Sequence, residues 1–165
     1  STPEQARAAV AAGKYPPEGI RGVAGTRASR YGADLPQYFA EWNRRVLIAV
    51  QMETVQALEN VEAIAAVPGL DVLFIGPNDL SASLGCFRQF DHPAFRAAAE
   101  HVLQTARRAG VAAGYMAAGA ADVLTRIDQG FRFVALGSDA RLLSGAAAAA
   151  YAEVRKGLAE RASAG

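Results

Sequence analysis

Two acidic residues stand at corresponding positions after two apolar runs of this 165-residue sequence. Glu53 follows the strand-like run at residues 46–50, and Asp79 follows the run at residues 72–75. Their numbers differ by 26 (79 − 53), about the length of one βαβ repeat. Because neighbouring parallel strands lie about 4.8 Å apart, the two carboxylates could share one cation such as Mg²⁺ or Mn²⁺. The spacing therefore predicts a metal-assisted active site.

Gln51 belongs to the same predicted site. It lies two residues before Glu53, and side chains two apart on a strand point the same way. We expect it to hydrogen-bond a substrate or a metal-bound water while Glu53 holds the metal. Each acid also has a structural interpretation: Glu53 as a first-turn acid of the next helix, and Asp79 as the N-cap of a short turn at residues 80–84. Their matched positions at two strand ends favour the metal site.

The other candidate residues carry weaker signals. Ser138 and Asp139 directly precede a predicted helix, so we expect them to cap it. His92 is predicted to lie on the surface or at a helix cap, and His101 on a helix surface or interface, so the chain has no histidine placed as a general base. Two loop arginines could bind an anion or be solvated. They are Arg21 and Arg27.

The elements that must position these residues alternate regularly. Helices are predicted at residues 3–12, 34–45, 54–67, 92–109, 120–129 and 140–162, strands at 46–50, 70–75, 111–116 and 131–136, and a turn-rich loop at 14–31. The strands are mostly continuous apolar runs, as when both faces of a sheet are covered. Successive βα units predict a parallel α/β sheet, either open and doubly wound or part of a (β/α)₈ barrel. No G-x-G-x-x-G or G-x-x-x-x-G-K-[ST] motif is present, which argues against the Rossmann and P-loop folds.

Composition bounds the function. With 17 Lys and Arg against 16 Asp and Glu, the net charge of +1 gives no electrostatic reason to expect binding to nucleic acid or an anionic membrane. The only cysteine, Cys86, excludes a disulfide within the chain and fits the reducing cytoplasm; with no histidine near it, we assign it no nucleophilic role. No apolar run approaches the roughly 20 residues of a membrane span. The start at Ser1, without Met, resembles a helix cap, so we expect further residues upstream in the natural protein.

Four motifs, in the right order, carry a resemblance to a known family. They are YPPEGIRG at 15–22, QMET at 51–54, GPNDLS at 76–81 followed by Gly85, and GSD at 137–139 followed by Leu142 and Leu143. They resemble the YPP-x-G-x-RG, Q-x-E-[ST], GP-x-DLS and G-x-D…LL elements of the HpcH/HpaI family of class II, metal-dependent 2-oxo acid aldolases. Any one motif alone is weak, but the set is specific and spans most of the chain.

The resemblance implies a fold and a site. The fold is the (β/α)₈ barrel of the phosphoenolpyruvate/pyruvate superfamily, with residues 1–165 as a single domain covering roughly its second half. Glu53 and Asp79 are implied as ligands of Mg²⁺, Mn²⁺ or Co²⁺, with Gln51 as a catalytic and substrate-binding residue beside the metal-bound oxygens. The backbone N–H groups of Asn78 and Asp79 are implied to bind the pyruvate carboxylate. Met116 is implied to line an apolar pocket.

The implied activity is the reversible cleavage of 4-hydroxy-2-oxo acids to pyruvate and an aldehyde through a metal-bound pyruvate enolate. The histidine base and a pyruvate-binding arginine are expected outside this chain, in the first half of the barrel. The implied assembly is a homo-oligomer, a hexamer or trimer, in which the helix at 140–162 packs on a neighbouring subunit. Two alternatives stay open: a non-catalytic half-barrel that lacks the base, and a citrate-lyase-like carbon–carbon lyase on the same barrel.

Overall fold

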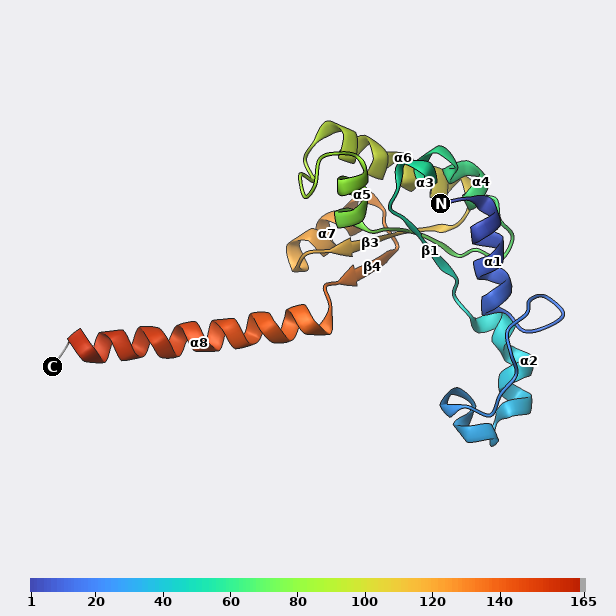
Figure 1. Cartoon of the computed structure of the whole chain (residues 1–165), viewed down its shortest axis with the longest axis horizontal. Coiled ribbons are helices and arrows are strands. Elements are labelled where there is room, and N and C mark those ends of the chain that lie inside the picture. Colours follow the sequence, from blue (N-terminus) through green and yellow to red (C-terminus); the bar gives the residue numbers. More distant parts are fainter. Residues whose placement is uncertain (164–165) are drawn as a thin grey trace.

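Four parallel strands form the centre of the computed structural model, which describes residues 1–163 (Figure 1). They are β1 (Ala49–Met52), β2 (Val72–Ile75), β3 (Ala112–Ala117) and β4 (Phe133–Leu136). Their order in the sheet is β1-β2-β3-β4, and each neighbouring pair is parallel. Because consecutive strands are neighbours and helices carry the crossovers, the parallel α/β prediction is confirmed.

Most of the helices begin and end within one residue of the positions predicted from the sequence. They are α1 (Pro3–Gly13), α2 (Leu35–Arg45), α3 (Val55–Glu59), α4 (Val61–Ala65), α5 (Pro77–Ser83), α6 (Pro93–Ala109), α7 (Ala120–Gln129) and α8 (Asp139–Ser163), with a 3₁₀ helix η1 (Arg27–Gly32). Thr2 and Gln5 form a capping box at the start of α1, at 3.1 and 3.3 Å. Gly110 and Gly130, at φ 74° and 103°, end α6 and α7 in the left-handed conformation.

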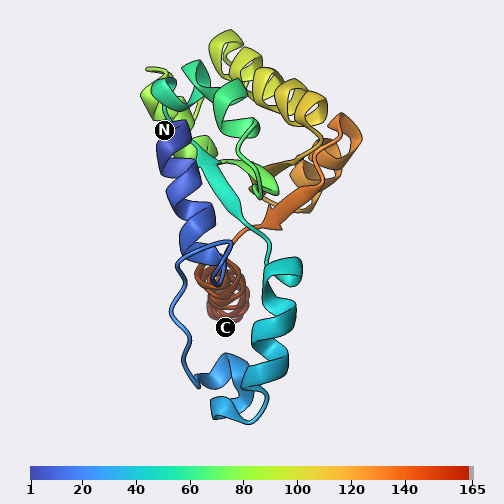
Figure 2. The same cartoon turned by 90° about the vertical axis from the view of Figure 1, so that its right-hand side faces the viewer.

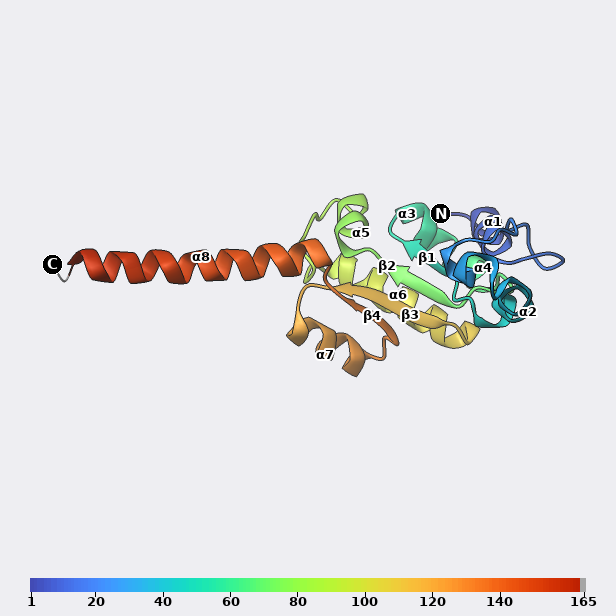
Figure 3. The ribbon, with the colours of Figure 1, turned by 90° about the horizontal axis from the view of Figure 1, so that it is seen from below.

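One face of the sheet packs against helices. α6 lies against β2 and β3, and α7 lies against β3 and β4 (Figure 3). Leu73 and Tyr115 on the strands join Phe95, Val102 and Leu103 of α6 in one buried cluster. Burying an aliphatic or aromatic side chain of this size stabilises the fold by roughly 1.5–3 kcal/mol, so this layer fixes the strand ends in place.

The other face of the sheet differs from the prediction. The continuous apolar runs suggest two covered faces, yet Met116 and Phe133, on the other face, are 37% and 40% exposed. At the centre of this face Gly114 pairs with Phe74 on β2 and Phe133 on β4, and the two rings meet edge to face at 5.9 Å. A Cβ atom on Gly114 would lie 2.6 Å from the Phe74 ring, so glycine is required there.

Two predicted elements are wrong in their bounds. The single helix expected at 54–67 is broken at Asn60 into α3 and α4, because the Asn60 side chain donates to the backbone carbonyl of Gln56 at 2.8 Å. The strand expected at 46–50 instead spans Ala49–Met52, since Ile48 N–H bonds to the Asp71 carboxylate at 2.7 Å. Gln51 therefore lies inside β1 rather than after it. The other strand bounds move by one or two residues.

α8 projects away from the rest of the molecule (Figure 1), and Figure 2 views it along its axis. Nearly all of its residues are exposed, including large apolar side chains that are 58–74% exposed. They are Leu142, Leu143, Tyr151, Val154 and Leu158. Its packing on a neighbouring subunit stays a prediction. Over residues 1–163, no helix is both long and apolar enough to span a membrane.

Candidate active site

The predicted side chains of β1 meet at the end of β2. Met52 pairs with Ile75 and Ile75 with Tyr115, so the next row of the sheet holds Glu53, Gly76 and Met116. A Cβ atom on Gly76 would lie 2.8 Å from Glu53 Oε2 and 3.5 Å from Gln51 Nε2. Glu53 and Gln51 thus point to the same side of the sheet, as predicted. The absent side chain at Gly76 leaves room for both.

A cavity of about 190 Å³ opens beside this row, on the open face of the sheet. Its lining includes four residues that the sequence placed in the site, Gln51, Asn78, Asp79 and Met116. Phe74, Gly76, Pro77, Phe90, Ala118 and Arg141 complete it. Glu53 does not line the cavity itself, but its carboxylate lies against Gly76 at the cavity edge. The cavity therefore gathers residues from three strand ends and from the first turn of α8.

The local structure argues against the helix-capping interpretation of Asp79 and against the interpretation of Glu53 as a first-turn acid of the next helix. Asp79 lies inside the first turn of α5, whose N-cap is Gly76, so it is not the N-cap of a later turn. Glu53 precedes Thr54, whose hydroxyl caps α3 by accepting Ala57 N–H at 3.0 Å, so Glu53 is outside the helix. Ser81 is fully buried and bridges the Asn78 carbonyl and Arg88 N–H, which explains the serine of the motif.

Other candidates lie away from the cavity. His92 caps α6 by accepting Ala94 N–H at 3.2 Å, and His101 pairs with Glu62 on the surface at 3.5 Å, as their surface and cap predictions required. The Arg21 guanidinium lies over the Trp42 ring, 3.9 Å from its centroid, so it anchors its loop to α2 rather than facing the site. Arg27 is exposed in η1, and Cys86 is buried.

Sequence reasoning missed Arg141 and Phe90 as lining residues. The ends of the strands were visible in the sequence, but the direction in which the first turn of α8 would point was not. The only available signal was the position of Arg141, two residues after the GSD element at 137–139.

The donor set suits a hard divalent cation. Mg²⁺ is usually held by one or two carboxylates while keeping waters and substrate oxygens, which matches Glu53 and Asp79 beside an open cavity. Within the described part of the chain, no cluster of three or more His, Cys, Asp or Glu side chains could hold a metal. A site made here would therefore be completed by water, substrate or other residues. Because Gly76 has no Cβ atom, the Glu53 carboxylate can lie close to the Gly76 backbone at the edge of the cavity.

A partly buried network supports the wall of the cavity at the end of β3. Ala118, which lines the cavity, donates its N–H to Asp122 at 2.9 Å, and Asp122 pairs with Arg126 at 2.9 Å. The Arg126 guanidinium lies 4.1 Å from the centroid of the Tyr115 ring. Burial raises the pKa of Tyr115 to about 12, an effect that the charge of Arg126 opposes and that of Asp122 adds to. Tyr115 is therefore a neutral structural residue.

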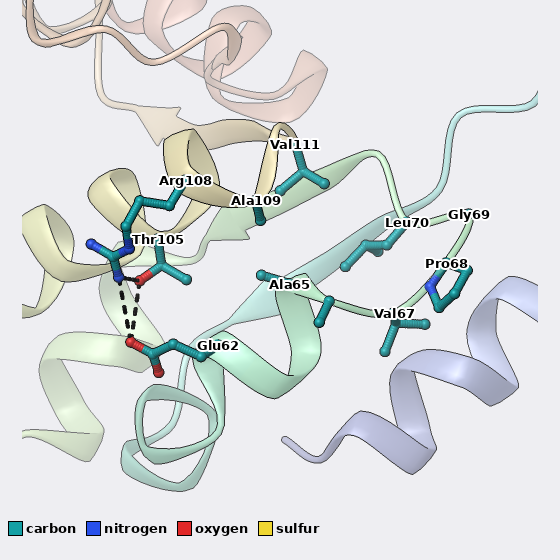
Figure 4. A pocket seen from close by; sticks show the side chains of 11 residues that line it. Glu62, Ala65, Val67, Pro68, Gly69, Leu70, Thr105, Arg108, Ala109 and Val111 are labelled. Atoms are coloured by element: carbon teal, nitrogen blue, oxygen red, sulfur yellow. Dashed lines mark hydrogen bonds and ion pairs between the residues drawn. The ribbon is translucent and has the colours of Figure 1, made fainter.

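A larger cavity, about 580 Å³, lies near the N-terminal ends of the strands, between α4 and α6 (Figure 4). Its polar residues already satisfy one another: Arg108 Nη2 lies 3.5 Å from Glu62 Oε1 and 2.8 Å from Thr105 Oγ1. Leu70 and Val111, at the starts of their strands, line the rest. Active sites of parallel α/β folds form at the opposite, C-terminal strand ends, so size alone does not make this cavity the site.

Comparison with known proteins agrees with the motifs. The model of the family described as HpcH/HpaI aldolase/citrate lyase matches residues 1–146. The chain is 43% identical over 138 residues to a 5-keto-4-deoxy-D-glucarate aldolase of Klebsiella pneumoniae, covering 84% of this chain and 54% of that protein. It is 44% identical over 148 residues to a hydroxypyruvate/pyruvate aldolase of Chromohalobacter salexigens, covering 88% and 58%. The chain spans about half the length of the curated relatives it matches.

Solved structures confirm the fold. A HpcH/HpaI aldolase/citrate lyase family protein from Burkholderia cenocepacia has a TM-score of 0.83 at 38% identity, covering 93% of this chain and 62% of that one. Macrophomate synthase has a TM-score of 0.74 at 31% identity, covering 93% and 56%. The four parallel βα units are therefore part of the (β/α)₈ barrel predicted from the sequence.

Proposed function

Because this chain belongs to the HpcH/HpaI aldolase/citrate lyase family, we propose that the protein containing it is a metal-dependent aldolase. It reversibly cleaves 4-hydroxy-2-oxo acids to pyruvate and an aldehyde. The observation that carries the proposal is the convergence of Glu53 and Gln51 on Gly76, beside the cavity that Asp79 lines. Two relatives named as aldolases of oxo acids, 43% and 44% identical, support it.

The residues of this chain take distinct roles. Glu53 and Asp79 would hold Mg²⁺, Mn²⁺ or Co²⁺, which, when bound, supplies Lewis-acid stabilisation for negative charge that develops on the substrate. Gln51 lines the cavity, where its side-chain amide would orient a substrate oxygen by hydrogen bonding. Asn78 and Asp79, at the start of α5, contact the carboxylate of the oxo acid. Met116 would give the cavity an apolar wall beside the reacting carbons.

The general base comes from outside this chain in this proposal. The sequence holds two histidines, and both are engaged away from the cavity, His92 in a helix cap and His101 with Glu62. The carboxylates in the site are assigned to the metal. This division means that the part described here binds and polarises the substrate, while the proton transfer depends on the rest of the protein.

The proposal is tested by following pyruvate release from a 4-hydroxy-2-oxo acid by the whole protein. We expect a chelator to abolish turnover and added Mn²⁺ or Mg²⁺ to restore it. Glu53→Ala and Asp79→Ala should each lower metal-dependent turnover by more than about a hundredfold, because each removes one of the two protein ligands. Glu59→Ala, an exposed acid on α3, is the matched control. Unchanged pyruvate release in either site variant would contradict the assignment.

Two other functions have different signatures. The family description also covers citrate lyases, so a carbon–carbon lyase acting on coenzyme A thioesters is the second candidate. Assaying coenzyme A thioesters beside free 4-hydroxy-2-oxo acids separates the two enzymes. A non-catalytic protein would bind Mn²⁺ together with pyruvate yet give no turnover with either substrate class.

A further inference from the structure

One side chain of α7 holds the end of β3 in place beside the candidate site. Asp122 Oδ2 accepts the N–H of Ala118, a residue that lines the cavity, at 2.9 Å. The carbonyl of the same peptide group belongs to Ala117 and accepts Gly137 N–H at 3.2 Å. The peptide group that follows β3 is therefore held from one side by α7 and from the other by the end of β4.

The segment after β3 has no polar side chain of its own that could fix it. Residues 117–121 are alanine and glycine only, and Gly119, the N-cap of α7, has no side chain to cap the helix. Glycine also allows the backbone more conformations than any other residue. Asp122 is the first residue after this segment whose side chain can accept a hydrogen bond. Its carboxylate therefore sets the direction of this part of the cavity wall.

The Asp122 carboxylate is itself held by a second set of contacts. Its Oδ1 atom accepts Arg126 Nε at 2.9 Å, and the two side chains are only 26% and 17% exposed. The Arg126 guanidinium lies 4.1 Å from the centroid of the buried Tyr115 ring and donates to Gln129 Oε1 at 3.2 Å. Hydrogen bonds between charged groups are stronger than neutral ones, and partial burial strengthens them further. The carboxylate is thus fixed in one orientation, which is what the positioning of a neighbouring group requires.

We propose that Asp122 is a positioning residue for the candidate site and that it acts through the peptide group between Ala117 and Ala118. This inference rests on the proposed function. Asp122 does not line the cavity, so it affects the substrate only through the wall that it holds. Through Gly137, the same peptide group also ties the end of β3 to the turn that leads into α8. A carboxylate that only capped α7 would stabilise the fold and leave substrate binding unchanged.

Two substitutions of Asp122 separate positioning from stability. Asp122→Ala loses both bonds, whereas the amide oxygen of Asp122→Asn can still accept Ala118 N–H although the ion pair with Arg126 is lost. Pyruvate release from 4-hydroxy-2-oxopentanoate by the whole protein with Mn²⁺ gives KM and kcat. Asp122→Ala should raise KM by about tenfold to a hundredfold and leave kcat close to wild type, because the wall contacts the substrate before and during reaction. Asp122→Asn should keep a KM near wild type. Mn²⁺ affinity should be unchanged in both, since Glu53 and Asp79 lie at other strand ends.

Asp128→Ala is the matched control, because Asp128 is exposed on the same helix and does not line the cavity; it should leave KM unchanged. If Asp122→Ala does not fold, Asp122→Glu replaces it, since the extra methylene group displaces the carboxylate and should also raise KM. A wild-type KM in the variant that has lost the Ala118 bond would show that Asp122 is a helix cap only. An equal rise in KM in Asp122→Asn would show that this bond is not the cause. Either result overturns the inference while the proposed function stands. A wild type that releases pyruvate from no 4-hydroxy-2-oxo acid would overturn the proposed function, and this inference with it.

Discussion

Replacing Gly76 by alanine tests the site without removing any functional group. The backbone of Gly76, at φ −90° and ψ 95°, is open to any L residue, so the substitution introduces no backbone strain. The new Cβ atom would instead lie 2.8 Å from Glu53 Oε2. The carboxylate sits at the end of a flexible side chain and can move away at little cost to the fold. Gly76→Ala should therefore separate site geometry from stability.

The size of the effect follows from the distances. Ordinary contact begins at 3.4 Å, so Glu53 Oε2 must retreat by 3.4 − 2.8 = 0.6 Å, while Gln51 Nε2, at 3.5 Å, is not displaced. Metal–ligand distances tolerate only about 0.2 Å. We therefore expect Mn²⁺ affinity to fall by about tenfold to a hundredfold, with turnover falling as well. The free energy of unfolding should change by less than about 1 kcal/mol.

Titration calorimetry with Mn²⁺ and urea denaturation measure the two quantities on the whole protein. Gly157→Ala is the control, since a Cβ atom there meets nothing within 4 Å. Wild-type Mn²⁺ affinity and turnover in Gly76→Ala would refute the reasoning, because they would show that the Glu53 carboxylate is not used where it lies. A loss of stability as large as the loss of affinity would refute it too, since the carboxylate would then not be free to move.

Two further predictions concern the scaffold. Because burial raises the pKa of Tyr115 from 10.0 to about 12, its stabilising effect should be complete below pH 10 and lost as pH rises through about 12; urea denaturation across this range should show a smaller fall for Tyr115→Phe. Asn43 accepts Tyr15 N–H at 2.7 Å and donates to the Tyr15 carbonyl at 2.9 Å. Asn43→Ala should lower the free energy of unfolding by about 1–3 kcal/mol, whereas exposed Gln37→Ala should not.

The residues at the strand ends of this protein could be predicted from the sequence more accurately than the bounds of its helices. Glu53 and Asp79 could be placed because parallel strands bring their C-terminal ends to one edge, a rule that needs only the order of the elements. The break at Asn60 could not be predicted, because apolar periodicity continues through it and only the bond from its side chain to Gln56 ends α3. Arg141 was missed for a related reason, since its direction depends on the turn at Gly137.

The open face of the sheet ties the proposed chemistry to the rest of the protein. The cavity lies on this face, where Met116 and Phe133 are 37% and 40% exposed. Exposed apolar area costs about 25 cal/mol per Å², and metal-assisted cleavage gains from a site that excludes water. Both effects favour covering the face. Because the chain spans 54% of a curated aldolase that it matches, the cover and the base both have room in the remainder of such a protein. Removing the part of the protein outside this chain can therefore affect turnover differently from metal binding by Glu53 and Asp79. Both quantities need to be measured on the whole protein.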